Sequence, residues 1–154
     1  MKNLLKALFI TGGLLFASSG FAADMDINAD QNDIAIKGYD PVAYFTMSKA
    51  TKGDVNFTAT HKGAIYQFVS EENRDLFRSA PEKYAPQYGG YCAFGVSKDK
   101  KFDTDPTAWK IIEDKLYLNL NAQVQRRWLK DTDALISDAN TNWQEIAFVP
   151  ASDL

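Results

Sequence analysis

The chain has 154 residues, of which 45% are hydrophobic, 13% aromatic and 24% charged, a composition typical of one globular domain with one core. It excludes collagen-like and largely disordered chains. The formal net charge is −3, and the first residues contribute Lys2 and Lys6 without any acid, so the rest of the chain is more acidic still. This balance disfavours nucleic acid and anionic membrane surfaces as partners.

The N-terminal segment is typical of a secretory signal peptide. Lys2 and Lys6 precede the apolar run 7–15, which is shorter than the roughly 20 residues of a membrane span. The small-x-small pattern Gly20-Phe21-Ala22 predicts cleavage directly after it, which defines residues 1–22 as the signal peptide. We therefore expect a protein of the bacterial periplasm with no membrane span after cleavage.

The domain is predicted to begin after a short arm. Residues 23–33 are polar and aperiodic, which predicts a flexible arm, and the domain is expected over residues 34–146 with a tail at 147–154. Asp40, followed by a proline, predicts the start of a short helix over 42–45, because an N-cap carboxylate and a proline in the first turn both favour helix initiation.

A β-hairpin is predicted next. Apolar and polar residues alternate over 55–60, and a second run rich in apolar residues covers 64–69. His61 lies at the turn between the two runs, where Gly63 supplies the positive φ that a tight connection needs.

The remaining elements alternate between helices and a second hairpin. Ser70 is expected to cap a helix over 71–79, and a short helical turn follows over 81–84. Asp105 and Pro106 repeat the pattern of a helix start. A second hairpin is expected over 109–112 and 116–120, and the C-terminal part has the apolar spacing of helices.

These elements predict an α+β fold, with a small antiparallel sheet of hairpins, short helices and a C-terminal helical segment. The sequence shows no recognisable internal repeat, low-complexity tract or linker. The usual signatures of nucleotide binding, zinc proteases and serine hydrolases are missing, since no GxGxxG, Walker loop, CxxC, HExxH or GxSxG pattern occurs.

Two residues then stand out because each is the only one of its type. Cys92 is the single cysteine and His61 the single histidine. An exported lone cysteine cannot form an internal disulfide, so it packs as a small hydrophobe, reacts, or binds something. A thiolate and an imidazole together favour copper or zinc. Two ligands suit monovalent copper better than zinc, which normally takes four.

A resemblance adds to this interpretation. Three runs occur in one order, 38–45 (GYDPVAYF), 61–70 (HKGAIYQFVS) and 81–93 (PEKYAPQYGGYCA). From residue 38 to about 120 the chain resembles the YHS-domain family in its exported, stand-alone form, which is related to TRASH-type metal-binding domains. Short members of that family occur beside copper- and heavy-metal-handling proteins and use cysteines to hold metal.

The chain departs from that family at the cysteine positions. Ala43 follows the Asp-Pro-Val motif, and Val69 and Asn73 occupy the strand-to-helix junction, where family members carry cysteines. A zinc site built from several cysteines is therefore excluded. The resemblance implies that metal binding has either been rebuilt around Cys92 and His61 or been lost.

Three functions follow as expectations. The first is a periplasmic protein that handles copper, or zinc as the second choice, through Cys92 and His61, with a further donor from Tyr44, Tyr91, Met47 or water. The second is a non-catalytic module that has lost metal binding and binds a ligand or another periplasmic protein. The third, and least favoured, is a thiol enzyme with Cys92 as nucleophile and His61 as base.

Overall fold

A computed structural model describes residues 25–154 of the chain, and the predicted signal peptide lies outside the described residues. The order of elements runs η1 (Ile36–Gly38), α1 (Ala43–Thr46), β1 (Asp54–His61), β2 (Ala64–Phe68), α2 (Glu71–Ser79), α3 (Pro81–Tyr84), η2 (Gln87–Gly90), α4 (Ala93–Val96), β3 (Asp105–Ile112), β4 (Lys115–Asn119), α5 (Ala122–Trp128), α6 (Thr132–Ile146) and η3 (Ala151–Asp153). Among these elements, no helix is long and apolar enough to cross a membrane.

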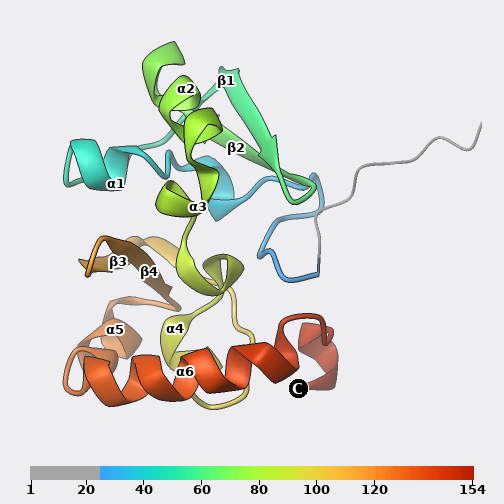
Figure 1. The fold of residues 1–154 in the computed structure, drawn as a ribbon, viewed down its shortest axis with the longest axis vertical. Coiled ribbons are helices and arrows are strands. Elements are labelled where there is room, and N and C mark those ends of the chain that lie inside the picture. The colour runs from blue at the N-terminus through green and yellow to red at the C-terminus, as the bar shows by residue number, and fades with distance from the viewer. Residues whose placement is uncertain (1–24) are drawn as a thin grey trace, which may run out of the picture.

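The predicted α+β fold is confirmed, and its strands form two separate antiparallel sheets of two strands each. Figure 1 shows β1 and β2 with α1, α2 and α3 in one half of the molecule, and β3 and β4 with α4, α5 and α6 in the other. The helices over 71–79 and 81–84 have the predicted bounds, and Ser70 caps the first of them by accepting a 3.2 Å hydrogen bond from the Asn73 N–H.

Strand β4 joins the two halves because both of its faces are buried. Leu116 and Leu118 belong to the core that the first half builds, whereas Tyr117 belongs to the core beneath α6. Since successive side chains of a strand point to opposite faces, one short strand supplies both cores. Side-chain packing of β4 into both cores therefore joins the two halves, although β4 belongs to the β3–β4 sheet alone.

The two halves repeat one backbone plan. Asp54 pairs with Phe68 at the open end of the first hairpin, and Asp105 pairs with Asn119 at the open end of the second. The same number of residues separates Asp54 from Asp105 as separates Phe68 from Asn119. In both hairpins the register shifts at the same place, directly after the opening pair. We call residues 35–84 the first repeat and residues 87–146 the second repeat.

The similarity continues beyond the hairpins. Ser70 before α2 and Asn121 before α5 both cap their helices through the side chain. Ala80 and Asp131, which precede α3 and α6, have φ/ψ of −153°/65° and −155°/61°. The sequence did not show this repeat because few residues are identical between the halves, and even the buried Phe68 corresponds to the buried, polar Asn119.

Two expectations about local structure need correction. Asp105 and Pro106 begin strand β3 rather than a helix, and the Asp105 carboxylate accepts a 2.8 Å hydrogen bond from the Thr107 N–H. His61 is the last residue of β1, so the turn itself is made by Lys62 and Gly63, both with positive φ. Position in a sheet overrides the local helix signal.

The described part of the predicted flexible arm is packed. Asp26 and Ile27 are 7% exposed, and the Asn28 N–H donates to the Gly89 carbonyl at 2.9 Å. A Cβ added at Gly89 would lie 1.7 Å from the Asp26 carbonyl oxygen, so only glycine lets the arm come this close.

The Lys101 ammonium group secures the arm and the chain after α6. It donates to the carbonyls of Met25, Ala147 and Val149 at 3.2, 2.6 and 2.8 Å. The three hydrogen bonds that the ammonium donates compensate for the burial of this side chain, although burial still lowers its pKa.

Candidate functional site

The Cys92 side chain lies in the second repeat and is 1% exposed. Its thiol donates to the Asn119 Oδ1 at 3.7 Å, and its sulfur accepts from the Leu120 N–H at 3.2 Å. Burial raises the pKa of the thiol, and hydrogen bonds from the backbone of Gly95, Leu120 and Phe94 act in the opposite direction with less effect. This environment favours a neutral thiol and disfavours a nucleophilic thiolate.

Asp40 in the first repeat makes contacts similar to those of Cys92 in the second. Asp40 lies shortly before α1, whereas Cys92 is the N-cap of α4, and the Asp40 carboxylate accepts from the N–H groups of Val42 and Ala43 at 2.8 and 3.1 Å. The same carboxylate accepts from the Val69 N–H at 2.9 Å, directly after β2, as the Cys92 sulfur accepts from the Leu120 N–H directly after β4.

Asp40 and Cys92 therefore have the same structural task. Each ties a short helix to the end of the following hairpin through a buried acceptor. The aspartate of the Gly-Tyr-Asp-Pro run thus holds the fold of the first repeat together, and Cys92 has the corresponding role in the second repeat.

His61 lies elsewhere, at the rim of a pocket of about 210 Å³. Its Nε2 is 3.2 Å from the Glu82 Oε1, its side chain is 16% exposed, and its ring packs against Tyr66 and Phe77. The hydrogen bonds, ion pairs and ring contacts of residues 25–154 include none between His61 and Cys92. The structure thus brings His61 together with Glu82, a residue that sequence analysis did not single out.

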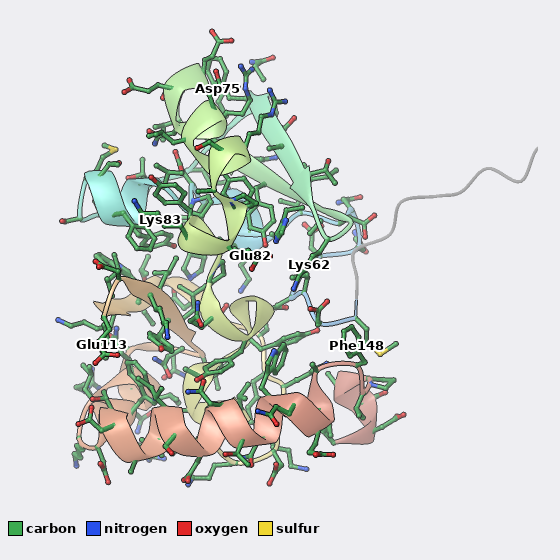
Figure 2. The ribbon with its side chains drawn as sticks, viewed as in Figure 1. Lys62, Asp75, Glu82, Lys83, Glu113 and Phe148 are labelled. Carbon is green, nitrogen blue, oxygen red and sulfur yellow. The ribbon has the colours of Figure 1, made fainter. Side chains whose placement is uncertain are left out.

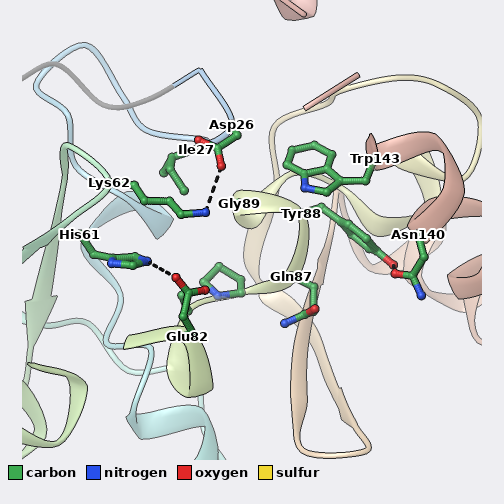
Figure 3. A pocket seen from close by; sticks show the side chains of 12 residues that line it. Asp26, Ile27, His61, Lys62, Glu82, Gln87, Tyr88, Gly89, Asn140 and Trp143 are labelled. Atoms are coloured by element: carbon green, nitrogen blue, oxygen red, sulfur yellow. Dashed lines mark hydrogen bonds and ion pairs between the residues drawn. The ribbon is translucent and has the colours of Figure 1, made fainter. Parts of the chain in front are cut away.

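The pocket is built from four segments that are far apart in the sequence. The arm, the end of β1 with the β1–β2 turn, one continuous stretch from α3 through η2, and α6 all contribute (Figure 3). Its lining residues are Asp26, Ile27, His61, Lys62, Glu82, Ala85, Pro86, Gln87, Tyr88, Gly89, Asn140 and Trp143.

Charged groups form one side of this pocket, and aromatic rings form the other. The Lys62 ammonium is 3.1 Å from the Asp26 Oδ2, and Figure 3 shows this pair beside the His61–Glu82 pair. Across the pocket, the rings of Tyr88 and Trp143 lie 5.8 Å apart. Figure 2 places Lys62 and Glu82 at the surface between the two halves of the molecule.

Two buried polar atoms near this pocket have no hydrogen-bond partner within the described residues. One is the Asp26 Oδ1, and the other is the Tyr66 hydroxyl. Burial raises the pKa of Tyr66, and the nearby carboxylates of Glu82 and Asp26 raise it further. Unpartnered buried acceptors cost stability, so their presence at a pocket indicates a place where a ligand group or water can bind.

The other donors suggested by the sequence do not line this pocket. Tyr44 is fully buried, and its hydroxyl donates to the Pro106 carbonyl at 2.8 Å. Tyr91 packs against Trp143, and Met47 is exposed at the end of α1. Within residues 25–154, no three His, Cys, Asp or Glu side chains gather in a way that would hold a metal ion.

Comparisons with known proteins add no family. No family model, no curated protein and no solved structure matches the chain.

Proposed function

We propose that this chain is a non-catalytic binding protein of the periplasm whose ligand site is the pocket at His61, Glu82, Lys62 and Asp26. The observation that carries the proposal is the pocket itself, about 210 Å³ in volume, with two ion pairs facing two aromatic rings. A volume of this size suits one small polar molecule or a hydrated ion.

The comparison between repeats supports a binding role for these residues. The second repeat forms the same hairpin and the same helix start with Ile112 where the first has His61, and with Asp133 where the first has Glu82. Since the same backbone plan forms in the second repeat without an imidazole, the plan itself does not depend on a pair of this kind. The presence of the His61–Glu82 pair in one repeat alone favours a task in binding.

The environment of Cys92 argues against a thiol enzyme. A nucleophilic cysteine needs a lowered pKa and access to substrate, whereas burial raises the pKa of this thiol and leaves it 1% exposed. The export of the protein and its resemblance to YHS domains belong to the proposal as predictions from the sequence.

Copper binding by Cys92 together with His61 is a second candidate, motivated by the sequence alone. It requires the sulfur and an imidazole nitrogen within about 4 Å of each other, given metal–ligand bonds of roughly 2.0 to 2.3 Å. Loss of monovalent copper binding in Cys92→Ser with retention of the fold would support this candidate.

The proposed pocket is tested by ligand-induced stabilisation. The purified protein is heated with a panel of small carboxylic acids, amino acids, amines and metal ions, and a binding compound raises the melting temperature. Trp143→Ala and Lys62→Ala are expected to remove the shift, whereas Lys110→Ala on the far hairpin keeps it. A panel without any stabilising compound, or shifts unchanged in both pocket variants, would contradict the proposal.

A further inference from the structure

The distance between His61 and Glu82 matches the geometry of two neighbouring metal ligands. The imidazole Nε2 and the carboxylate Oε1 are 3.2 Å apart. Metal–nitrogen and metal–oxygen bonds of about 2.0 to 2.2 Å, meeting at an angle of about 100°, place the two donor atoms about 3.2 Å apart. The donors come from different elements, β1 and α3, whose backbones the fold holds in position.

We infer that His61 and Glu82 form a two-ligand site for a divalent transition-metal ion, with water in the remaining coordination positions. This inference rests on the proposed function, because the site lies in the same pocket. A neutral imidazole and a carboxylate favour ions such as Cu²⁺ and Zn²⁺ over Ca²⁺ and Mg²⁺, which prefer oxygen ligands alone.

The electrostatics of the pocket favour a cation beside this pair. Glu82 is 75% exposed, which leaves room for water on the metal, and His61 is 16% exposed. Asp26 adds a second carboxylate, and its Oδ1 accepts no hydrogen bond from the described residues. Lys62 neutralises only one of these two carboxylates through its 3.1 Å contact.

The two repeats provide matched variants for a test. His61→Ile introduces the residue that the second repeat carries at the corresponding position, so the hairpin is expected to fold. Glu82→Gln removes the anionic donor at an exposed position. Asp133→Asn is the control, because Asp133 is the second residue of α6 as Glu82 is of α3, and it lines a different pocket together with Ile112.

The measurement is titration of the purified protein with Cu²⁺, followed by calorimetry and by electron paramagnetic resonance. We expect one ion per chain and the signature of one imidazole nitrogen, which is unambiguous because the chain has one histidine. His61→Ile and Glu82→Gln are each expected to weaken binding about tenfold or more, and His61→Ile to remove the nitrogen signature. Asp133→Asn should change the affinity less than twofold.

Two results would overturn the metal site. One is equal Cu²⁺ affinity in the wild type, His61→Ile and Glu82→Gln, and the other is no uptake tighter than about 100 μM. If Cu²⁺ fails while an organic compound stabilises the protein through Trp143 and Lys62, the metal inference falls and the proposed pocket stands. If neither binds, both proposals fail.

Discussion

Replacement of Cys92 by alanine separates a structural role from a metal-binding role. The sulfur accepts from the Leu120 N–H at 3.2 Å, whereas the Phe94 N–H also donates to the Asn119 Oδ1 at 3.3 Å. Alanine therefore leaves the part-buried N–H of Leu120 without its acceptor, at a cost of about 1–3 kcal/mol. The space of the lost sulfur adds about 1 kcal/mol, since it is the size of one methyl group.

We therefore expect Cys92→Ala to lower the free energy of unfolding by about 2–4 kcal/mol. Cys92→Ser keeps an acceptor and should lose about half as much. Urea unfolding followed by circular dichroism measures both values, with an unchanged slope as the sign that only stability has changed. The melting shift produced by a pocket ligand should stay the same in both variants.

A Cys92→Ala variant as stable as the wild type would exclude this structural role of the sulfur. A variant of unchanged stability that no longer binds monovalent copper would exclude it equally, because that result would make the sulfur a ligand rather than a cap.

Three further predictions concern the fold. Asp40→Asn should lower the free energy of unfolding by about 3 kcal/mol in a urea titration, because a neutral amide cannot accept all the hydrogen bonds that the carboxylate receives from two sides. Gly89→Ala should release the arm and speed its cleavage by protease, since its φ is +59° and a Cβ would strike the Asp26 carbonyl; cleavage at the wild-type rate would contradict the packing. Burial raises the pKa of Tyr44, Tyr66 and Tyr88 above their value in the unfolded chain. The stability that their neutral, buried form contributes is therefore fully present below about pH 10 and is lost as pH rises further. Absorbance at 295 nm should show these three tyrosines ionising together with unfolding. Ionisation of the three in a protein that stays folded would contradict their burial.

Much of the local structure was predictable from short-range signals. Ser70 before two glutamates predicted the start of α2, and Gly63 predicted the tight connection of the first hairpin, because caps and turns depend on neighbouring residues only. The same reasoning failed at Asp105 and Pro106. Their pattern is that of a helix start, but pairing with β4 places them in a strand.

The candidate site was only half visible in the sequence. His61 was noticeable as the single histidine, whereas its partner Glu82 is one of many acidic residues and has no local signal. Cys92 was equally noticeable, but its contacts with Asn119 and Leu120 give it the task that Asp40 has in the first repeat.

The amino-acid sequence by itself determined the α+β class, most helix and turn positions and the two unique side chains, since these follow from periodicity, capping and composition. Only the tertiary structure decided which side chains meet. The pairing of His61 with Glu82 and of Cys92 with the end of β4 depends on how the repeats fold and pack, and the spacing of residues along the chain carries no information about such long-range contacts.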